Sequence, residues 1–233
     1  MSDLRNPPKA AVGDTLHAVV RAGLGAIPVA GNAAVELFNA IVTPPLERRR
    51  DEWRKSVGEK LKELEDAGCV RAEDLMHNDA FITTMMQASN AAIRNHQPEK
   101  LDALRNAVAN AALPHPPEAS IQQLFIQFVD GFTVWHLRML DLMQDARRWF
   151  QNNGKSAPQF AISSSFERVL LAAYPELDQH REFYDLIDAD LKQRGLSAGS
   201  GMHVMMSAEG AYQKHTTTLG DQFLAFISPP KLA

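Results

Sequence analysis

Apolar residues recur at helical spacing through most of this sequence, and prolines and glycines interrupt the pattern at short intervals. The longest uninterrupted stretch covers residues 119–152 and ends before Gly154. Its apolar positions are Ile121, Leu124, Phe125, Phe128, Phe132, Trp135, Met139 and Leu142. Steps of three and four residues place such side chains on one face of a helix. The sequence therefore predicts a mainly α-helical fold with a long central helix over 119–152.

Capping residues and helix breakers divide the rest of the chain into shorter predicted helices. Asn78 or Asp79 is placed to cap one helix, and Gly195 is placed to end another. Thr43, Pro44 and Pro45 favour a new helix start, because proline is tolerated in the first turn. The predicted helices cover 14–27, 32–42, 43 to about 68, 78–96, 99–113, 164–173, 179–194 and 219–227.

The stretch between Gly195 and Leu219 is typical of a β-hairpin. Short apolar and β-branched runs at 204–206 and 212–218 flank Gly210, and we predict that they pair with each other. Two helices, a hairpin and a final helix follow the order of a winged-helix module. We therefore predict a flexible lead over 1–13, an all-helical domain over 14–155 that begins with an apolar helical hairpin over 14–42, and a winged-helix-like module over 160–228.

Composition and charge argue against several classes of function. The net charge is -4 and the pI is near 6.1, so the chain as a whole has no electrostatic attraction to nucleic acid or anionic membranes. Cys69 is the only cysteine, which excludes an intramolecular disulfide and a cysteine-based zinc site. Residues 1–12 contain no apolar stretch of signal-peptide length. We expect a cytoplasmic protein with no cofactor and no metal.

None of the motifs that suggest chemistry is specific. Gly23, Gly25 and Gly31 are not followed by the Lys and Ser/Thr of a phosphate-binding loop. Arg71 and His77 match the loose spacing of HEPN-type ribonucleases, but a chain of this composition produces such a match by chance. His136 lies near Asp130 and Asp141 in sequence, at separations that do not share a helical face. We predict no catalytic residues and expect interaction rather than catalysis.

Nucleic-acid binding is the first interaction to weigh, because winged-helix modules often bind DNA. Such a module needs cations on its second helix and wing. The cationic candidates for an interaction surface are Arg181, Lys192, Arg194, His203, Lys214 and His215. The predicted helix over 179–194 is nevertheless rich in acidic residues, which disfavours DNA. A DNA-binding transcriptional regulator stays the alternative.

The apolar stretch over 16–42 is the second candidate surface. Its prominent side chains are Leu24, Ile27, Val35, Leu37, Phe38 and Ile41. Arg48, Arg49 and Arg50 follow it, a combination suited to the interface of a membrane. Packing of the stretch inside the helical domain is the simpler interpretation, and both stay open here.

Several segments together resemble a known family. They are 27–31 with 43–48, 99–106, 133–138, 183–187 with 194–196, and 217–224. In this order they are similar to a family of bacterial proteins with no assigned activity. The resemblance implies a bacterial origin and carries no catalytic residue.

These observations lead to one expectation of function. We expect a helical scaffold with a docking module that binds a protein partner, forms a homo-oligomer and acts in stress or phage defence, with membrane contact under some conditions.

Overall fold

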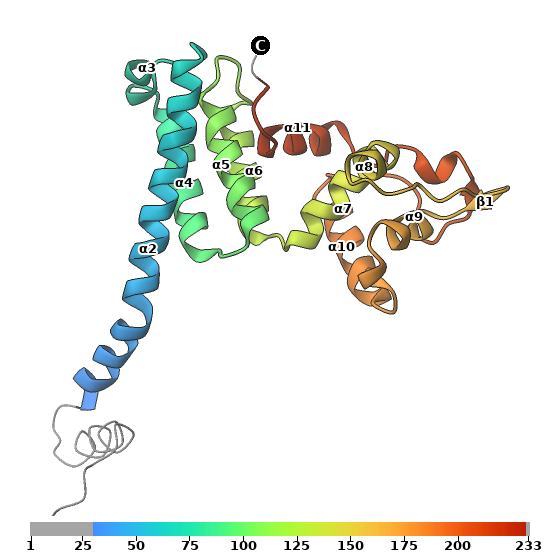
Figure 1. Ribbon diagram of the computed structural model, residues 1–233, viewed down its shortest axis with the longest axis horizontal. Helices are drawn as coiled ribbons and strands as arrows, with labels where there is room; N and C mark the ends of the chain where they lie inside the picture. The colour runs from blue at the N-terminus through green and yellow to red at the C-terminus, as the bar shows by residue number, and fades with distance from the viewer. Residues whose placement is uncertain (1–29, 232–233) are drawn as a thin grey trace, which may run out of the picture. The chain divides into compact units, whose positions relative to one another are not determined.

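The computed structural model describes residues 30–231, with side chains described from residue 34 onward. These residues are mainly helical and contain one small antiparallel sheet (Figure 1). They belong to two units: residues 30–49 to the first and residues 50–231 to the second. The predicted lead over 1–13 and the predicted helix over 14–27 lie outside the described residues.

The chain order of the elements is as follows. The α-helices are α2 (Ala30–Asp66), α3 (Ala72–Met76), α4 (Asp79–Arg94), α5 (Pro98–Ala112), α6 (Ala119–Gly131), α7 (Val134–Gln144), α8 (Ala146–Asn152), α9 (Phe166–Ala173), α10 (Arg181–Gln193) and α11 (Thr218–Ile227). Two short 3-10 helices are η1 (Pro175–Leu177) and η2 (Gly210–Tyr212), and the strands are β1 (Ser163–Ser164) and β2 (Met206–Ser207).

Helix α2 runs through the point where two helices were predicted. Pro44 and Pro45 lie inside it, so the predicted boundary at Thr43 is wrong. Each proline removes one backbone donor to a carbonyl four residues earlier. Those carbonyls belong to Ala40 and Ile41, two exposed residues. Water can therefore replace the lost hydrogen bonds, which is why the helix tolerates both prolines.

The predicted central helix over 119–152 is wrong as a single element, because it forms three helices. Thr133 caps α7 in a capping box with His136. Asp145 caps α8 by accepting a hydrogen bond from the Arg148 amide at 3.0 Å. Short polar side chains compete for backbone amides, so they favour helix starts over helix interiors. The apolar spacing predicted the helical state, and these caps decided where each helix begins.

The predicted hairpin is also wrong, although strands form nearby. β2 pairs antiparallel with β1, with Ser164 opposite Met206, and Thr216 bridges to Ser197. Gly210 donates its amide to the Ser207 Oγ at 3.0 Å, which folds the expected turn into η2. Hence the two runs pair with earlier parts of the chain and not with each other.

One apolar core runs through the unit formed by residues 50–231. It includes Trp53 from α2, the faces of α4 to α10, and Phe223 and Phe226 from α11. Phe125 of α6 contacts both of these phenylalanines, with ring centroids 5.4 and 5.7 Å apart. Core residues thus lie on both sides of the boundary predicted near 155–160, and that boundary stays a prediction.

Candidate functional site

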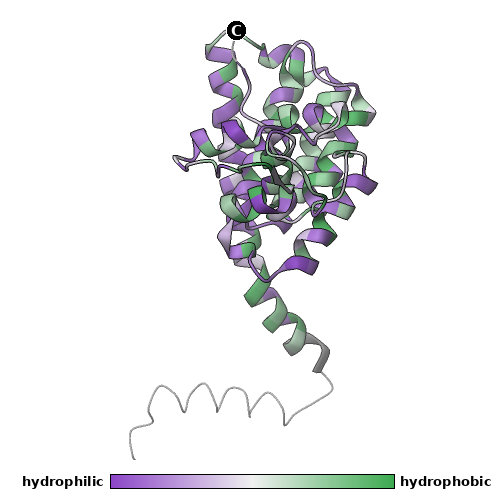
Figure 2. Cartoon of the chain, turned by 90° about the vertical axis from the view of Figure 1, so that its right-hand side faces the viewer, coloured by the Kyte–Doolittle hydropathy of each residue, from purple (hydrophilic) through white to green (hydrophobic). Residues whose placement is uncertain are grey.

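Residues 34–45 of α2, here called the apolar segment, expose large hydrophobic side chains to solvent. Val35, Leu37, Phe38 and Ile41 are 56 to 64% exposed, and Val42 is 38% exposed. At 3.6 residues per turn these five side chains cover about half of the helix circumference. Hydrophobic colouring runs through this stretch of α2 in Figure 2. The segment is therefore an amphipathic helix with an exposed apolar face.

Four of the predicted surface residues lie on this face, namely Val35, Leu37, Phe38 and Ile41. The other two, Leu24 and Ile27, lie outside the described residues. The simpler interpretation, in which this stretch packs inside the helical domain, stays a prediction. Singly exposed apolar residues need no explanation, but five on one face are typical of an interaction surface.

A second apolar surface is a groove between the end of α2, α3 and α4, here called the α2–α4 groove. Its volume is about 490 Å³. The lining is Gly58, Leu61, Lys62, Glu65, Val70, Ala72, Leu75, Met76, Phe81, Ile82 and Met85. Lys62 and Glu65 are its only charged lining residues, and both are exposed. The groove thus offers aliphatic and thioether surface and few groups that would orient a polar ligand.

Local sequence explains why this groove stays open. α2 ends in a turn at Gly68, whose φ of 72° suits glycine, with the Cys69 amide donating to the Leu64 carbonyl at 2.9 Å. α3 then has room for only one turn, and Asn78 starts α4 by capping the Phe81 amide at 3.0 Å. Because α3 is so short, it leaves Leu75 partly exposed and Met76 65% exposed.

The cations predicted as an interaction surface are mostly paired with acidic neighbours. On α10, Arg181, Lys192 and Arg194 pair at i,i+4 spacing with Asp185, Asp188 and Asp190, at 3.4, 2.7 and 3.0 Å. Lys214 pairs with Asp221 at the start of α11. These pairs are local, and their acidic partners would lie beside any phosphate that the cations contacted. The arrangement lowers the attraction of residues 160–228 for nucleic acid.

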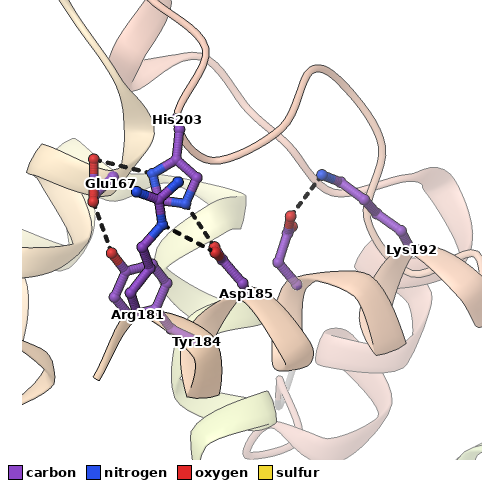
Figure 3. A network of polar contacts seen from close by, with 7 residues as sticks. Glu167, Arg181, Tyr184, Asp185, Lys192 and His203 are labelled. Carbon is purple, nitrogen blue, oxygen red and sulfur yellow. Dashed lines mark hydrogen bonds and ion pairs between the residues drawn. The ribbon is translucent and has the colours of Figure 1, made fainter. Parts of the chain in front are cut away.

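His203 lies at the centre of a polar cluster, the His203 network, formed with Glu167, Arg181, Tyr184 and Asp185 (Figure 3). Its Nδ1 lies 3.1 Å from Glu167 Oε2, and its Nε2 lies 2.7 Å from Asp185 Oδ1. Tyr184 donates its hydroxyl hydrogen to Glu167 Oε1 at 2.7 Å. The network joins the loop before β2 to α9 and α10.

The charges in this network set the protonation of His203. Burial disfavours the charged ring, but the hydrogen bonds and charges of Asp185 and Glu167 outweigh it and raise the pKa of His203. Burial also opposes ionisation of Glu167, while Tyr184 and His203 outweigh it and lower the pKa of that carboxyl. Both nitrogens of an imidazolium donate, so the charged form fits two flanking carboxylates.

His136 meets a different acid from the two that its sequence position suggested. Its Nε2 lies 3.2 Å from Asp190 Oδ2, and its Nδ1 accepts from the Thr133 amide at 3.2 Å. The ring stacks on Phe132, with centroids 4.6 Å apart. Burial lowers the pKa of His136, with Asp190 opposing the effect. This geometry indicates a neutral ring that donates to Asp190 and caps α7, which is a structural role.

The last predicted cationic residue, His215, lies beside a polar hollow in the loop between α10 and α11. This hollow has a volume of about 420 Å³, and Ser200, Ser207, Lys214 and Thr216 are among its lining residues. Behind it, His215 Nε2 and Ser197 Oγ are buried without a hydrogen-bond partner among the described residues. Burial lowers the pKa of His215. The two polar side chains border a cavity of about 10 Å³, which is room for one water-sized occupant.

Residues 30–231 contain no cluster of three or more His, Cys, Asp or Glu side chains arranged to hold a metal ion. Within the same range, no helix combines the length and hydrophobicity that a membrane crossing requires.

Sequence reasoning missed the α2–α4 groove and the His203 network. The groove has one signal in the sequence: Gly68 and Asn78 bracket a stretch too short to cover two longer helices. The i,i+4 acid and base pairs of α10 were also readable from the sequence. In contrast, Glu167 and His203 are 36 residues apart in sequence, and only the tertiary fold brings them together.

The chain matches no family model, no curated protein and no solved structure.

Proposed function

We propose that this chain is a non-enzymatic interaction protein whose docking element is the apolar segment of α2, and that this element binds the interface of a lipid bilayer. One observation carries the proposal: Val35, Leu37, Phe38, Ile41 and Val42 form a continuous exposed apolar face. A helix with one apolar and one polar face lies in the plane of a membrane interface without crossing it.

The composition of the segment favours binding to a lipid interface over exposure to water. Glu36 lies on the opposite side of the helix from the apolar face, and Asn39 lies beside the edge of that face next to Val35, so headgroups and water would meet both. Arg48, Arg49 and Arg50 follow within the same helix and can meet anionic headgroups, although Glu47, Asp51 and Glu52 beside them offset part of that attraction. The five residues are 38 to 64% exposed, so burying the remainder of each contributes about half of the roughly 1.5–3 kcal/mol of full burial.

Vesicle flotation tests this proposal. Full-length protein is expected to float with vesicles of phosphatidylcholine and phosphatidylglycerol. The double variant Phe38→Glu/Ile41→Glu is expected to bind at least about 100-fold more weakly, because it removes two buried side chains and each 1.4 kcal/mol is a factor of ten. Neither residue belongs to the core, so the variant should keep its helical content.

A matched control separates this effect from charge alone. Ile162 is 84% exposed and lies next to β1, outside the apolar segment. Ile162→Glu is expected to float like the unmodified protein. Equal binding of all three proteins, or no binding of the unmodified protein at low salt, would contradict the lipid proposal.

The alternative proposal is a DNA-binding regulator built on α9, α10 and α11 in a winged-helix-like order. The paired cations of α10 argue against it, because Arg181, Lys192 and Arg194 each have an acidic partner one turn away. In fluorescence anisotropy at physiological salt we expect no duplex affinity tighter than the nonspecific range of about 10⁻⁴–10⁻⁶ M. Sequence-dependent binding in the nanomolar range would favour the regulator instead.

A further inference from the structure

The apolar segment needs cover when no bilayer is present, and the same chain carries an open apolar groove. Five exposed hydrophobic side chains on one helix face are an aggregation liability in water. The α2–α4 groove also exposes apolar surface, since Leu61, Leu75, Ile82 and Met85 remain only partly covered. Each copy of the chain therefore brings one apolar helix and one apolar groove.

We propose that the α2–α4 groove binds the apolar segment of a second copy of this chain. The inference rests on the assignment of that segment as the docking element. An amphipathic helix enters a groove through anchors at i, i+3, i+4 and i+7. Phe38, Ile41 and Val42 have this spacing, with Val35 and Leu37 on either side of them on the same face.

The lining of the groove favours an apolar helix over a small polar ligand. Small-molecule sites contain polar groups that converge to fix orientation. Here the lining is aliphatic, aromatic and methionine, apart from exposed Lys62 and Glu65. Met76 and Met85 are unbranched and adaptable, which suits them to accommodate large aliphatic and aromatic side chains.

Charge is consistent with the same occupant. Glu36 is the only charged residue of the apolar segment, on the side away from its apolar face. Lys62 at the rim of the groove pairs with Asp66 of its own helix at 3.1 Å, and 71% of the lysine side chain is exposed. An exposed pair of this kind contributes little and exchanges partners readily. The apolar face of the segment can therefore enter the groove while Glu36 and Lys62 both stay in water, so docking buries no unpaired charge.

Two copies form a closed assembly when each binds the apolar segment of the other. If each copy places its segment in the groove of the other, both apolar surfaces of both copies are covered and growth stops at two chains. A one-way arrangement would leave a free segment and a free groove at its ends. The expected species in water is thus a closed dimer.

Sedimentation equilibrium of full-length protein tests the dimer. The segment variant Phe38→Glu/Ile41→Glu and the groove variant Met76→Glu are each expected to raise the dimer dissociation constant at least about tenfold, because each places a charge in the apolar contact. Met76 is 65% exposed, so its substitution leaves the core intact. Ile162→Glu serves as the control and should dimerise normally. A monomeric unmodified protein at all concentrations overturns the proposal.

Mixing the two variants gives a sharper test. The segment variant keeps an intact groove, and the groove variant keeps an intact segment. Their mixture should form a heterodimer through one restored contact, with a lower dissociation constant than the homodimer of either variant. If the mixture stays monomeric while the unmodified protein dimerises, the dimer uses another surface and the proposal is wrong.

Cross-linking identifies whether the segment comes from another copy. Cys69, the only cysteine, precedes Val70 at the end of the groove. A chain with Phe38→Cys and Cys69→Ser, mixed with unmodified chain and a bis-maleimide linker, is expected to give a cross-linked heterodimer. The chain that carries Phe38→Cys together with native Cys69 should also cross-link between copies. Exclusive cross-linking within one chain would show that the segment covers its own groove and overturn the proposal.

Vesicle binding distinguishes failure of the lipid proposal from failure of the dimer proposal. The groove variant Met76→Glu should bind vesicles at least as well as the unmodified protein, because its segment is free. A dimer without lipid binding would remove the lipid proposal and leave the dimer proposal standing. Lipid binding by a strictly monomeric protein would do the reverse.

Discussion

Several single residues in the C-terminal part of the chain link helices and loops to one another through side-chain hydrogen bonds and ion pairs. Tyr184 and Asp185 of α10, Glu167 of α9 and His203 of the following loop form one network. The Glu167 amide also donates to the Met202 carbonyl at 3.0 Å, and Met202 is buried. The network therefore fixes the loop that covers part of the core, which predicts a pH-dependent contribution to stability.

The sign of that contribution follows from the two shifted pKa values. The pKa of His203 is raised above 6.5, so its stabilisation is complete below that pH and is lost as pH rises through the raised value. The pKa of Glu167 is lowered below 4.5, so its stabilisation is complete above that pH and is lost only as pH falls through the lowered value. The network is strongest between these limits.

We predict that His203→Gln destabilises the protein by about 1–2 kcal/mol near pH 6, because it removes charge-assisted hydrogen bonds. The difference from the unmodified protein should shrink as pH rises toward 9. Urea unfolding over this pH range measures it. His180→Gln, at an exposed histidine before α10, is the control and should give a smaller difference near pH 6. A pH-independent effect of His203→Gln would show that the ring acts through packing alone.

At the scale of elements, the sequence predicts which stretches are helical more accurately than where each helix begins and ends. α4, α5 and α11 lie within two residues of the predicted ranges, because Asn78, Pro98 and Thr217 mark their starts. The stretch over 119–152 was predicted as one helix, since Thr133 and Asp145 interrupt it without any proline. Whether such a residue caps a helix or lies inside one depends on which backbone amides the tertiary fold leaves free.

The junction between α10 and α11 depends on one glycine. A Cβ at Gly220 would lie 2.1 Å from the Leu196 carbonyl oxygen, whereas a Cβ at Gly131 would meet no atom within 4 Å. Backbone at Leu196 cannot yield easily, because its amide and carbonyl are already hydrogen-bonded, to Leu191 and Thr217.

We predict that Gly220→Ala destabilises the protein by about 3 kcal/mol through overpacking. Gly131→Ala, the matched control in α6, should instead stabilise by about 0.4–1 kcal/mol, because alanine restricts the unfolded chain. Urea unfolding followed by circular dichroism measures both. A mild effect at Gly220 would mean that α11 can shift away from Leu196.

At the scale of the molecule, the core of residues 50–231 joins both ends of this range. Asn106 and Asn110 of α5 donate to the carbonyls of Ile227 and Phe226 at the end of α11, at 3.0 and 2.8 Å. Phe223 packs edge-on against Phe128, with centroids 5.9 Å apart. The helical stretch before residue 155 therefore depends on contacts with a helix that follows residue 217.

We predict that a fragment over 50–155 lacks a cooperative unfolding transition, because the loss of α11 exposes Phe125 and Phe128. A chain without residues 1–45 should keep the transition, since no core residue lies in that range that the structure describes. Differential scanning calorimetry distinguishes the two. Cooperative unfolding of the fragment would support the predicted boundary near 155–160 as a true domain boundary.

The sequence by itself determined the helical class, most helix starts and the apolar character of residues 34–45, because these depend on local spacing, caps and hydrophobicity. Only the tertiary structure decided which apolar faces are covered. It leaves the apolar segment and the α2–α4 groove open, and it places an acidic partner beside each cation of α10. An apolar face is buried only when other residues pack on it, and those residues are distant in the sequence.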